Sequence, residues 1–203
     1  MLISFEGIDG CGKTTQIMLL KERLIRERIP VEVLREPGGT ELSEMIRSLL
    51  LNPDVQMNPV TELLLFSAAR AELVAERVQP LLQQKVIVIL DRFYDSTVAY
   101  QGFGRGSLPI KEIHHLNKIA SQNIEPDATF FLDLDVDTAL QRRMSQSGAH
   151  DRMELAGGPF YERVRDGFLY LSKTHPRFVK LDANLPAETI HHQIWQRVSG
   201  MIH

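Results

Sequence analysis

Residues 7–14, Gly7-Ile8-Asp9-Gly10-Cys11-Gly12-Lys13-Thr14, decide the fold class of this chain. They match the pattern GxxxxGKS/T, a glycine-rich turn whose backbone N–H groups surround phosphate oxygens. The apolar run Leu2–Phe5 before the turn predicts a buried strand, and apolar residues recur at helical spacing over 14–28 after it. A strand before the turn and a helix after it are the context that this motif requires, so a chance match at a glycine-rich turn is the weaker interpretation.

The rest of the chain alternates short apolar runs with longer amphipathic segments. Four further runs predict strands at Val31–Leu34, Val86–Leu90, Ala128–Leu134 and Phe178–Leu181. Helical spacing predicts helices over 61–84, 110–122, 136–146, 159–173 and 187–199. We expect Pro30 to end the first helix and Pro80 to kink or divide the helix over 61–84. Alternating strands and helices indicate one α/β domain over 1–203, in which helices cover both faces of a five-stranded parallel sheet.

The composition excludes several classes of protein. Lysine and arginine total 23 and aspartate and glutamate total 26, so the net charge is −3, which argues against a nucleic-acid-binding or polybasic membrane-binding surface. Cys11 is the single cysteine, so no intramolecular disulfide is possible. Glu6 interrupts the N-terminal apolar run before a signal peptide can form, and no run approaches the ~18 residues of a membrane span. We expect a cytoplasmic protein with neither nucleic acid nor a membrane as partner.

The phosphate-binding turn brings its own chemistry. Lys13 is expected to contact the β- and γ-phosphates of a nucleotide, and the Thr14 hydroxyl to bind Mg²⁺. Asp91 directly follows the apolar strand 86–90, where a carboxylate would face that ion. An aspartate that caps the next helix is the alternative explanation.

Charged residues also follow the other strands. Arg92 stands beside Asp91, and Arg35 and Glu36 end the second strand before the tight turn 37–40. Ligands of open parallel sheets bind outside the carboxyl ends of the strands, so these clusters are expected to meet the phosphate-binding turn in one crevice.

Five segments resemble thymidylate kinase in their order and spacing. They are GIDGCGKTTQ (7–16), REPGGT (35–40), LLLFSAAR (63–70), DRFYDSTVAYQG (91–102) and HDRME (150–154). The resemblance runs from residue 3 to about 183 and implies the P-loop nucleoside monophosphate kinase fold. It implies transfer of the γ-phosphoryl group of ATP to dTMP, which gives ADP and dTDP in dTTP biosynthesis, with Mg²⁺ as cofactor. It also implies a homodimer.

The resemblance also implies a set of site residues. The ATP phosphates would be bound by Gly7, Ile8, Asp9, Gly10, Cys11, Gly12, Lys13, Thr14 and Thr15, with Thr14 and Asp91 at the metal. The dTMP would be bound by Arg35, Glu36, Pro37, Arg47, Phe66, Arg70, Arg92, Ser96, Thr97, Tyr100 and Gln101. The catalytic residues would be Lys13, Arg92, Arg152 and Asp9.

Two of these residues would recognise the base, and a third the sugar. The resemblance implies that Phe66 stacks on thymine, that Arg70 binds its carbonyl edge, and that Tyr100 crowds the C2′ position of the sugar. Phe66 and Arg70 stand four residues apart on one helix face, so both can reach one base. Without the resemblance, a core phenylalanine and a surface arginine would explain the pair equally well.

The family has two designs for the arginine that stabilises the γ-phosphate, either in the phosphate-binding turn or in a mobile lid. This turn contains no arginine, so the chain resembles the bacterial, lid-type design. The lid is expected near 145–158, with Arg142, Arg143 and Arg152 near the adenine and the phosphates. Gln146 occupies a position where such enzymes frequently carry a basic residue.

The expected chemistry needs no strong general base. The second pKa of a phosphate monoester is ~6, so the acceptor oxygen is largely ionised at neutral pH. Neither histidine pair, 114–115 or 191–192, has the helical spacing of a metal site. Two rival functions are a kinase for another nucleoside monophosphate and a nucleotide-dependent switch protein. The switch would carry guanine-specificity motifs, and no NKxD-like stretch occurs in 110–135.

Overall fold

The computed structural model describes residues 1–144, 152–153 and 157–202. Its centre is a parallel sheet of five strands in the order β2-β3-β1-β4-β5. The strands are β1 (Leu2–Glu6), β2 (Val31–Arg35), β3 (Ile87–Asp91), β4 (Ala128–Asp133) and β5 (Phe178–Asp182). The sequence prediction of a five-stranded parallel sheet is therefore confirmed, and the predicted strand ends are correct to within two residues.

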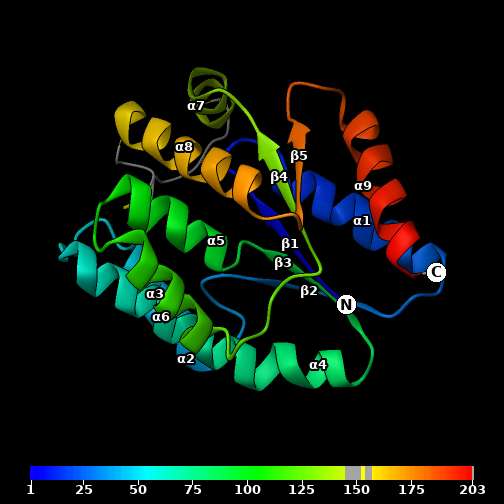
Figure 1. Cartoon of the computed structure of the whole chain (residues 1–203), viewed down its shortest axis with the longest axis horizontal. Helices are drawn as coiled ribbons and strands as arrows, with labels where there is room; N and C mark the ends of the chain where they lie inside the picture. Colours follow the sequence, from blue (N-terminus) through cyan, green and yellow to red (C-terminus); the bar gives the residue numbers. More distant parts are fainter. Residues whose placement is uncertain (145–151, 154–156, 203) are drawn as a thin grey trace.

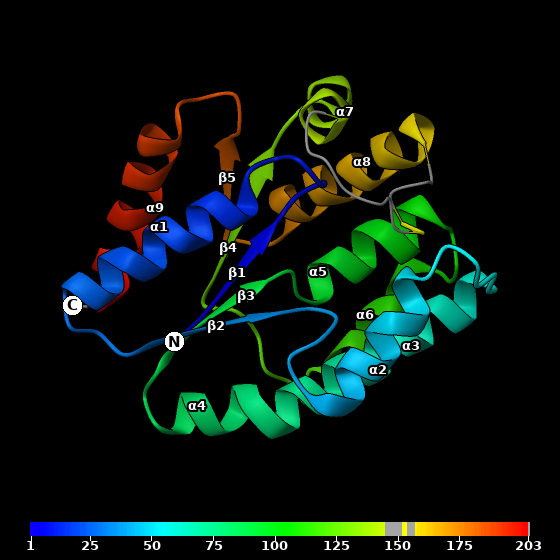
Figure 2. The same ribbon diagram turned by 180° about the vertical axis from the view of Figure 1, so that it is seen from behind.

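Helices cover both faces of the sheet (Figure 1). They are α1 (Lys13–Arg26), α2 (Glu41–Leu51), α3 (Pro59–Leu73), η1 (Val74–Val78), α4 (Gln79–Gln83), α5 (Tyr94–Thr97), η2 (Val98–Gly104), α6 (Ile110–Ala120), α7 (Val136–Met144), α8 (Gly158–Thr174) and α9 (Ala187–Ile202). Figure 2 shows α1 and α9 together on one face, while α3, α5 and α6 lie on the other. The three central strands β1, β3 and β4 are buried along almost their whole length because both of their faces are covered.

The largest apolar cluster lies between the sheet and its helices. Phe5, Ile89 and Phe130 of the sheet pack there with Leu20 of α1 and Phe168 of α8, all fully buried. This packing fixes the carboxyl ends of β1 and β3, from which the phosphate-binding turn and Arg92 extend.

Of the two predictions about prolines, the one for Pro30 is wrong and the one for Pro80 is confirmed. The first helix ends at Arg26, with Arg28 in the left-handed conformation (φ 60°), so it stops before Pro30. The expected helix over 61–84 is divided ahead of Pro80, because the π-helical η1 lies between α3 and α4. Pro80 has no backbone N–H to donate, and Gln79 donates to Val74 five residues back, so the helical hydrogen bonds shift by one residue just before the proline.

Three elements were not predicted: α2, α5 and η2. The helix α2 follows the Gly38-Gly39-Thr40 turn, where the Thr40 hydroxyl caps it by accepting the backbone N–H of Ser43 (3.1 Å). The pair α5–η2 occupies the segment 94–104, which is almost entirely buried and so carries no amphipathic period. Most of the expected lid, 145–151 and 154–156, lies outside the described residues.

Candidate active site

A cavity of about 400 Å³ opens at the carboxyl ends of β1, β2 and β3. The predicted site residues that line it are Asp9, Gly10, Gly12, Lys13, Thr14, Thr15, Arg35, Glu36, Pro37, Arg47, Phe66, Arg70, Asp91, Arg92, Ser96, Thr97, Tyr100, Gln101 and Arg143. Five predicted residues are not in its lining: Gly7, Ile8, Cys11, Arg142 and Arg152. Leu51, Phe93 and Met153 line the cavity without having been predicted.

The phosphate-binding turn depends on glycine at two crowded positions. A Cβ on Gly7 (φ 138°) would lie 2.6 Å from the carbonyl oxygen of Leu132, and a Cβ on Gly10 (φ 86°) would lie 2.6 Å from that of Ala139. Only glycine allows the backbone to pass so close to its neighbours in these conformations. The turn therefore keeps its backbone N–H groups at the start of α1, where the helix dipole favours an anion.

Lys13 is folded back over this turn. Its ammonium group donates to the carbonyl oxygens of Gly7 (3.1 Å) and Ile8 (3.2 Å), and it is 7% exposed. The Asp9 carboxylate lies 3.8 Å from the same nitrogen. When a nucleotide binds, its phosphate oxygens would replace the two carbonyl oxygens as partners of the Lys13 ammonium, because a charged oxygen forms the stronger hydrogen bond.

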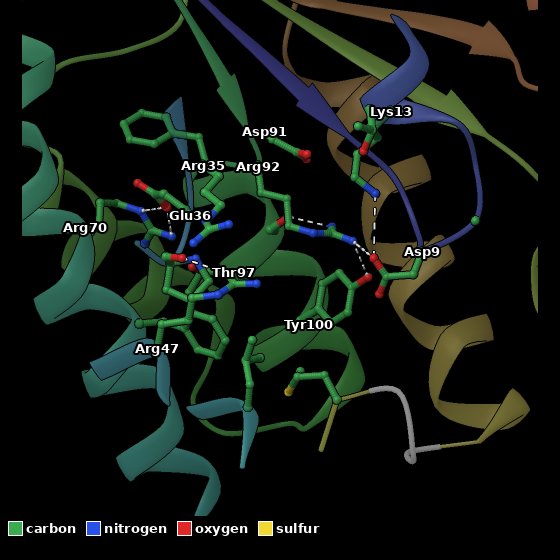
Figure 3. Close-up of a pocket in the computed structure, with 18 of the residues that line it drawn as sticks. Asp9, Lys13, Arg35, Glu36, Arg47, Arg70, Asp91, Arg92, Thr97 and Tyr100 are labelled. Carbon is green, nitrogen blue, oxygen red and sulfur yellow. Dashed lines mark hydrogen bonds and ion pairs between the residues drawn. The ribbon is translucent and has the colours of Figure 1, made fainter. Parts of the chain in front are cut away.

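Arg92 joins the turn to the far side of the cavity (Figure 3). It follows β3 with φ 69°, a conformation that residues with side chains rarely adopt. Its Nη1 donates to the carbonyl of Gly7 (2.8 Å) and to the hydroxyl of Ser96 (3.1 Å). Its Nη2 donates to the carboxylate of Asp9 (2.6 Å) and to the hydroxyl of Tyr100 (3.1 Å).

The charges in this cluster fix its protonation states. Burial opposes ionisation of Asp9, but the charges of Arg92 and Lys13 outweigh burial and lower the pKa of Asp9 to about 2. Burial raises the pKa of Tyr100 well above its ordinary value, so its phenol stays neutral. At neutral pH the cluster thus presents a carboxylate, two cations and a neutral hydroxyl.

Glu6, at the end of β1, is a buried carboxyl that was not predicted as a site residue. It accepts the backbone N–H of Phe93 (2.7 Å) on Oε1 and the hydroxyl of Ser96 (2.6 Å) on Oε2. Burial raises the pKa of Glu6 to about 8, and the nearby Asp95 adds to the shift. Glu6 therefore holds the backbone that follows Arg92.

Asp91 lines the cavity and does not cap a helix. Phe93 is at the N-cap of α5, and no side chain caps that helix, so the capping alternative is wrong. Asp91 and Thr14 are the two oxygen ligands that the sequence suggested for Mg²⁺, and both line the cavity. Over residues 1–144, 152–153 and 157–202, no three His, Cys, Asp or Glu side chains are grouped to hold a metal ion.

The opposite end of the cavity is built around Arg70 (Figure 3). Arg70 is 2% exposed, and its Nε and Nη2 each lie 2.8 Å from Oε2 of Glu36. Its Nη1 donates to the amide oxygen of Asn117 (3.3 Å). Burial raises the pKa of Glu36, although the charge of Arg70 opposes the shift. Phe66, one turn earlier on α3, is partly exposed in the same cavity, so the surface-arginine alternative is wrong.

Two further arginines lie at the wall of the cavity between these ends. Arg35 is exposed and donates through Nη2 to both carboxylate oxygens of Glu44 (3.0 and 3.1 Å). Arg47 of α2 donates through Nη1 to the carbonyl oxygen of Pro37 (2.8 Å). The Arg35 guanidinium is thus held by α2 and that of Arg47 by the turn after β2, and both residues border the cavity.

Gln101 depends on a residue that the sequence did not reveal. Its Nε2 donates to Oε1 of Glu62 (2.8 Å), a residue of α3 that is 1% exposed. The same carboxylate accepts Arg105 Nε (3.3 Å) on Oε1 and Arg152 Nη1 (2.6 Å) on Oε2. A glutamate in a predicted amphipathic helix is ordinarily a surface residue, so nothing in the sequence marked Glu62.

The three arginines expected near the lid lie in different places. Arg143 borders the cavity, and a Cβ on Gly10 would lie 3.4 Å from its Cγ. Arg142 donates to the carbonyl oxygen of Ala183 (3.2 Å). Arg152 donates to the carbonyl oxygen of Leu50 (2.8 Å) as well as to Glu62, so it is held against α2 and α3.

Comparison with known proteins gives a consistent result. The family model described as "Thymidylate kinase" matches residues 5–194. Curated proteins named thymidylate kinase include one from Chlorobium chlorochromatii, 49% identical over 96% of this chain and 92% of that protein. Another, from Chlorobaculum tepidum, is 48% identical over 99% of this chain and 98% of that protein. A crystal structure of thymidylate kinase from Ehrlichia chaffeensis superposes with a TM-score of 0.79 at 38% identity, covering 98% of each chain.

Proposed function

The chain belongs to the thymidylate kinase family, and we propose that its two substrates meet in the cavity beside the phosphate-binding turn. The protein is an ATP-dependent kinase that transfers the γ-phosphoryl group of ATP to dTMP, giving ADP and dTDP for dTTP synthesis. One observation carries the assignment of the site. A single cavity joins the turn around Lys13 to the pair Phe66 and Arg70, so a phosphate site and a base site face one another.

We assign the phosphates of ATP to the turn 7–15, and dTMP to the opposite end. Phe66 then stacks on thymine, and Arg70, fixed by Glu36, donates to a carbonyl of the base. Arg35, Arg47 and Arg92 surround the acceptor phosphate. Tyr100, held by Arg92, lies against the sugar, with Ser96 and Thr97 beside it.

Catalysis in this arrangement consists of positioning and charge neutralisation. The acceptor phosphate is already a nucleophile at neutral pH because its second pKa is ~6. Lys13 is buried and Arg92 is partly buried, so both cations lie beside the phosphates when negative charge develops on the transferring group. Asp9 holds both cations near the phosphates, because it contacts Lys13 at 3.8 Å and Arg92 at 2.6 Å.

Thr14 and Asp91 would hold Mg²⁺. A hydroxyl and a carboxylate are oxygen ligands of the kind that Mg²⁺ prefers, and two protein ligands suit an ion that keeps waters and phosphate oxygens in its shell. When bound, the ion supplies neutralisation of charge on the phosphates. The protein's part is to place the two oxygens at the cavity wall between β1 and β3.

We propose that the arginine for the transferring group lies outside the phosphate-binding turn, as in the lid-type design, and that Arg143 supplies it. Arg143 borders the cavity beside Gly10 and donates to the hydroxyl of Tyr161 (3.1 Å), whereas Arg152 is not in the cavity lining and pairs with Glu62. Arg143→Ala should lower kcat by 10²-fold or more with little change in the KM for dTMP, by analogy with arginine fingers worth ~10³–10⁵. If Arg152→Ala gives that result and Arg143→Ala does not, Arg152 is the catalytic arginine.

The experiment that tests the proposed function compares acceptors. The protein is mixed with ATP, Mg²⁺ and one of dTMP, dCMP, dGMP, dAMP or UMP, and ADP is measured by a coupled assay. We expect rapid ADP formation with dTMP and slow formation with purine nucleotides, which Phe66 and Arg70 do not fit. Equal rates with every acceptor, or a rate that needs no acceptor, would contradict the assignment of the base site.

A homodimer is a further proposal, supported by an apolar surface. Leu42, Met45 and Leu49 of α2 are 48%, 62% and 49% exposed and lie on one stripe of that helix. Leu64 of the adjacent α3 is 52% exposed. Exposed apolar stripes of this kind favour association with a second copy. Met45→Asp should shift the mass measured by light scattering from a dimer to a monomer.

We also propose that residues 1–203 form one domain, since one sheet and its helices account for the main apolar cluster. No described helix is long and apolar enough to span a membrane. A cytoplasmic location, and partners limited to the two nucleotides, are consistent with the free thiol of Cys11 and the net charge of −3.

A further inference from the structure

We propose that Glu62 is a positioning residue that fixes the side-chain amide of Gln101 with its carbonyl oxygen toward the nucleobase. By this orientation it selects pyrimidines that carry an N3–H, thymine and uracil, over cytosine. The inference rests on the proposed function, because it places the base of the acceptor between Phe66 and Gln101.

The orientation of the amide follows from what Glu62 can accept. A carboxylate has acceptors and no donor, so a glutamine amide in contact with it must present its NH₂ group. The contact is short, 2.8 Å from Gln101 Nε2 to Glu62 Oε1, and both side chains are at most 2% exposed. Arg105 and Arg152 share the charge of the same carboxylate, so Glu62 is compensated despite its burial.

The rest of Gln101 is held as firmly as its amide nitrogen. Its backbone carbonyl accepts both the hydroxyl (2.8 Å) and the backbone N–H (3.0 Å) of Ser107. Gln101 lines the cavity, and with Nε2 directed to Glu62, Oε1 is the amide atom left for a ligand. The residue therefore presents an acceptor at the base end of the site.

Arg70 presents the complementary donors at the same end. Its Nε and Nη1 each donate one hydrogen bond, to Glu36 and Asn117, and Nη2 lies 2.8 Å from Glu36, so N–H groups on Nη1 and Nη2 remain for a ligand. A donor from Arg70 and an acceptor from Gln101 match the O4 and N3–H of thymine. Cytosine carries an amino group and an unprotonated N3 at these positions, so it would set donor against donor and acceptor against acceptor. Buried mismatches of this kind cause strong rejection.

The test compares kcat/KM for dTMP and dCMP in the wild type and in Glu62→Gln. A glutamine at position 62 can donate as well as accept, so the Gln101 amide is free to turn over. We expect the ratio of kcat/KM for dTMP over dCMP to fall by about tenfold or more, because the site loses its fixed acceptor. The KM for ATP should stay the same. Arg105→Met is the matched control, since it removes another contact of Glu62 but leaves the Gln101 contact, and it should keep the wild-type ratio.

If Glu62→Gln lowers both kcat/KM values equally and leaves the ratio unchanged, Glu62 is only structural and the inference is wrong. Gln101→Met provides a second measurement, because it removes the amide itself. Adding Glu62→Gln to Gln101→Met should then cause no further loss of the ratio. If Glu62→Gln fails to fold, the double variant Glu62→Gln with Arg105→Met is used instead, because it removes one cation together with the carboxylate charge. The same ratio of kcat/KM for dTMP over dCMP is then measured for the double variant. Failure of the proposed function would be seen separately, as a wild type that does not phosphorylate dTMP.

Discussion

The ion pair between Glu36 and Arg70 supports the fold as well as the base site, and Glu36→Ala should show both roles. The two side chains are 4% and 2% exposed, and Glu36 Oε2 receives two Arg70 nitrogens at 2.8 Å. Without Glu36, the guanidinium keeps the 3.3 Å hydrogen bond to Asn117. Removing one partner of a buried pair leaves an uncompensated charge and costs ~3–5 kcal/mol.

That cost predicts a clear change in thermal unfolding. For a chain of this length, 1 kcal/mol corresponds to about 2–4 °C in Tm. Glu36→Ala should therefore lower Tm by roughly 6–20 °C in differential scanning calorimetry. The matched control is Glu32→Ala, which breaks the exposed pair between Glu32 and Arg77 (42% and 40%) and should cost less than about 1 kcal/mol.

A double variant separates stability from function. Glu36→Ala with Arg70→Met replaces the pair by apolar side chains and should recover much of the lost Tm, because a buried ion pair often contributes little net stability. It should not recover dTMP binding, since the donor to the base is gone. Our reasoning would be refuted if Glu36→Ala unfolded at the same temperature as Glu32→Ala.

Three other predictions follow from the same geometry. Lys13→Ala should keep the fold but reduce phosphoryl transfer by several orders of magnitude, because a buried cation at the transferring group is lost; near-normal turnover would contradict the ATP site. Phe66→Ala should weaken dTMP binding by ~1–3 kcal/mol in calorimetric titration and leave ATP binding unchanged, as expected for loss of base stacking; an equal loss for ATP would show that Phe66 is only a core residue. Burial raises the pKa of Glu6 from 4.5 to about 8. Between these pH values the folded state binds a proton at Glu6 that the unfolded state has released. The stability that this proton contributes to the folded state is therefore lost as the pH rises from 4.5 through 8. Glu6→Gln introduces a neutral side chain of the same shape that can still accept the Phe93 N–H. Its free energy of unfolding should therefore match the wild type at pH 5 and exceed it at pH 9 by an amount on the order of a few kcal/mol; an equal difference at both pH values would contradict the shift.

The parts of the fold with a regular pattern could be predicted from the sequence. The run Val86–Leu90 predicts a buried central strand, and the structure has β3 at Ile87–Asp91, between β1 and β2. The helix α2 was missed although most of its apolar residues lie on one side of the helix. Ile46 and Leu50 on that side are buried, whereas the neighbouring Met45 and Leu49 are exposed, so packing buries only part of the apolar face of this short helix.

The candidate site also contains residues that could be predicted from the sequence and residues that could not. The turn 7–14 has a sequence pattern of its own, and Asp91 and Arg92 follow a clear strand. Their convergence could therefore be predicted from the rule that ligands bind outside the carboxyl ends of parallel strands. The burial of Glu6 and Glu62 could not be predicted, because a glutamate is ordinarily a surface residue and only the tertiary packing buries these two. The pairing of Arg152 with Glu62 joins residues 90 positions apart, and no local pattern encodes such a contact.

The transfer of label from γ-³²P-ATP tests the central claim most directly. The wild-type protein is incubated with labelled ATP, Mg²⁺ and dTMP, and the nucleotides are separated by chromatography. We predict that the label moves from ATP to dTDP, that it does so only when dTMP is present, and that Lys13→Ala abolishes the transfer. Label that appears as inorganic phosphate, or that reaches another monophosphate faster than dTMP, would contradict the account.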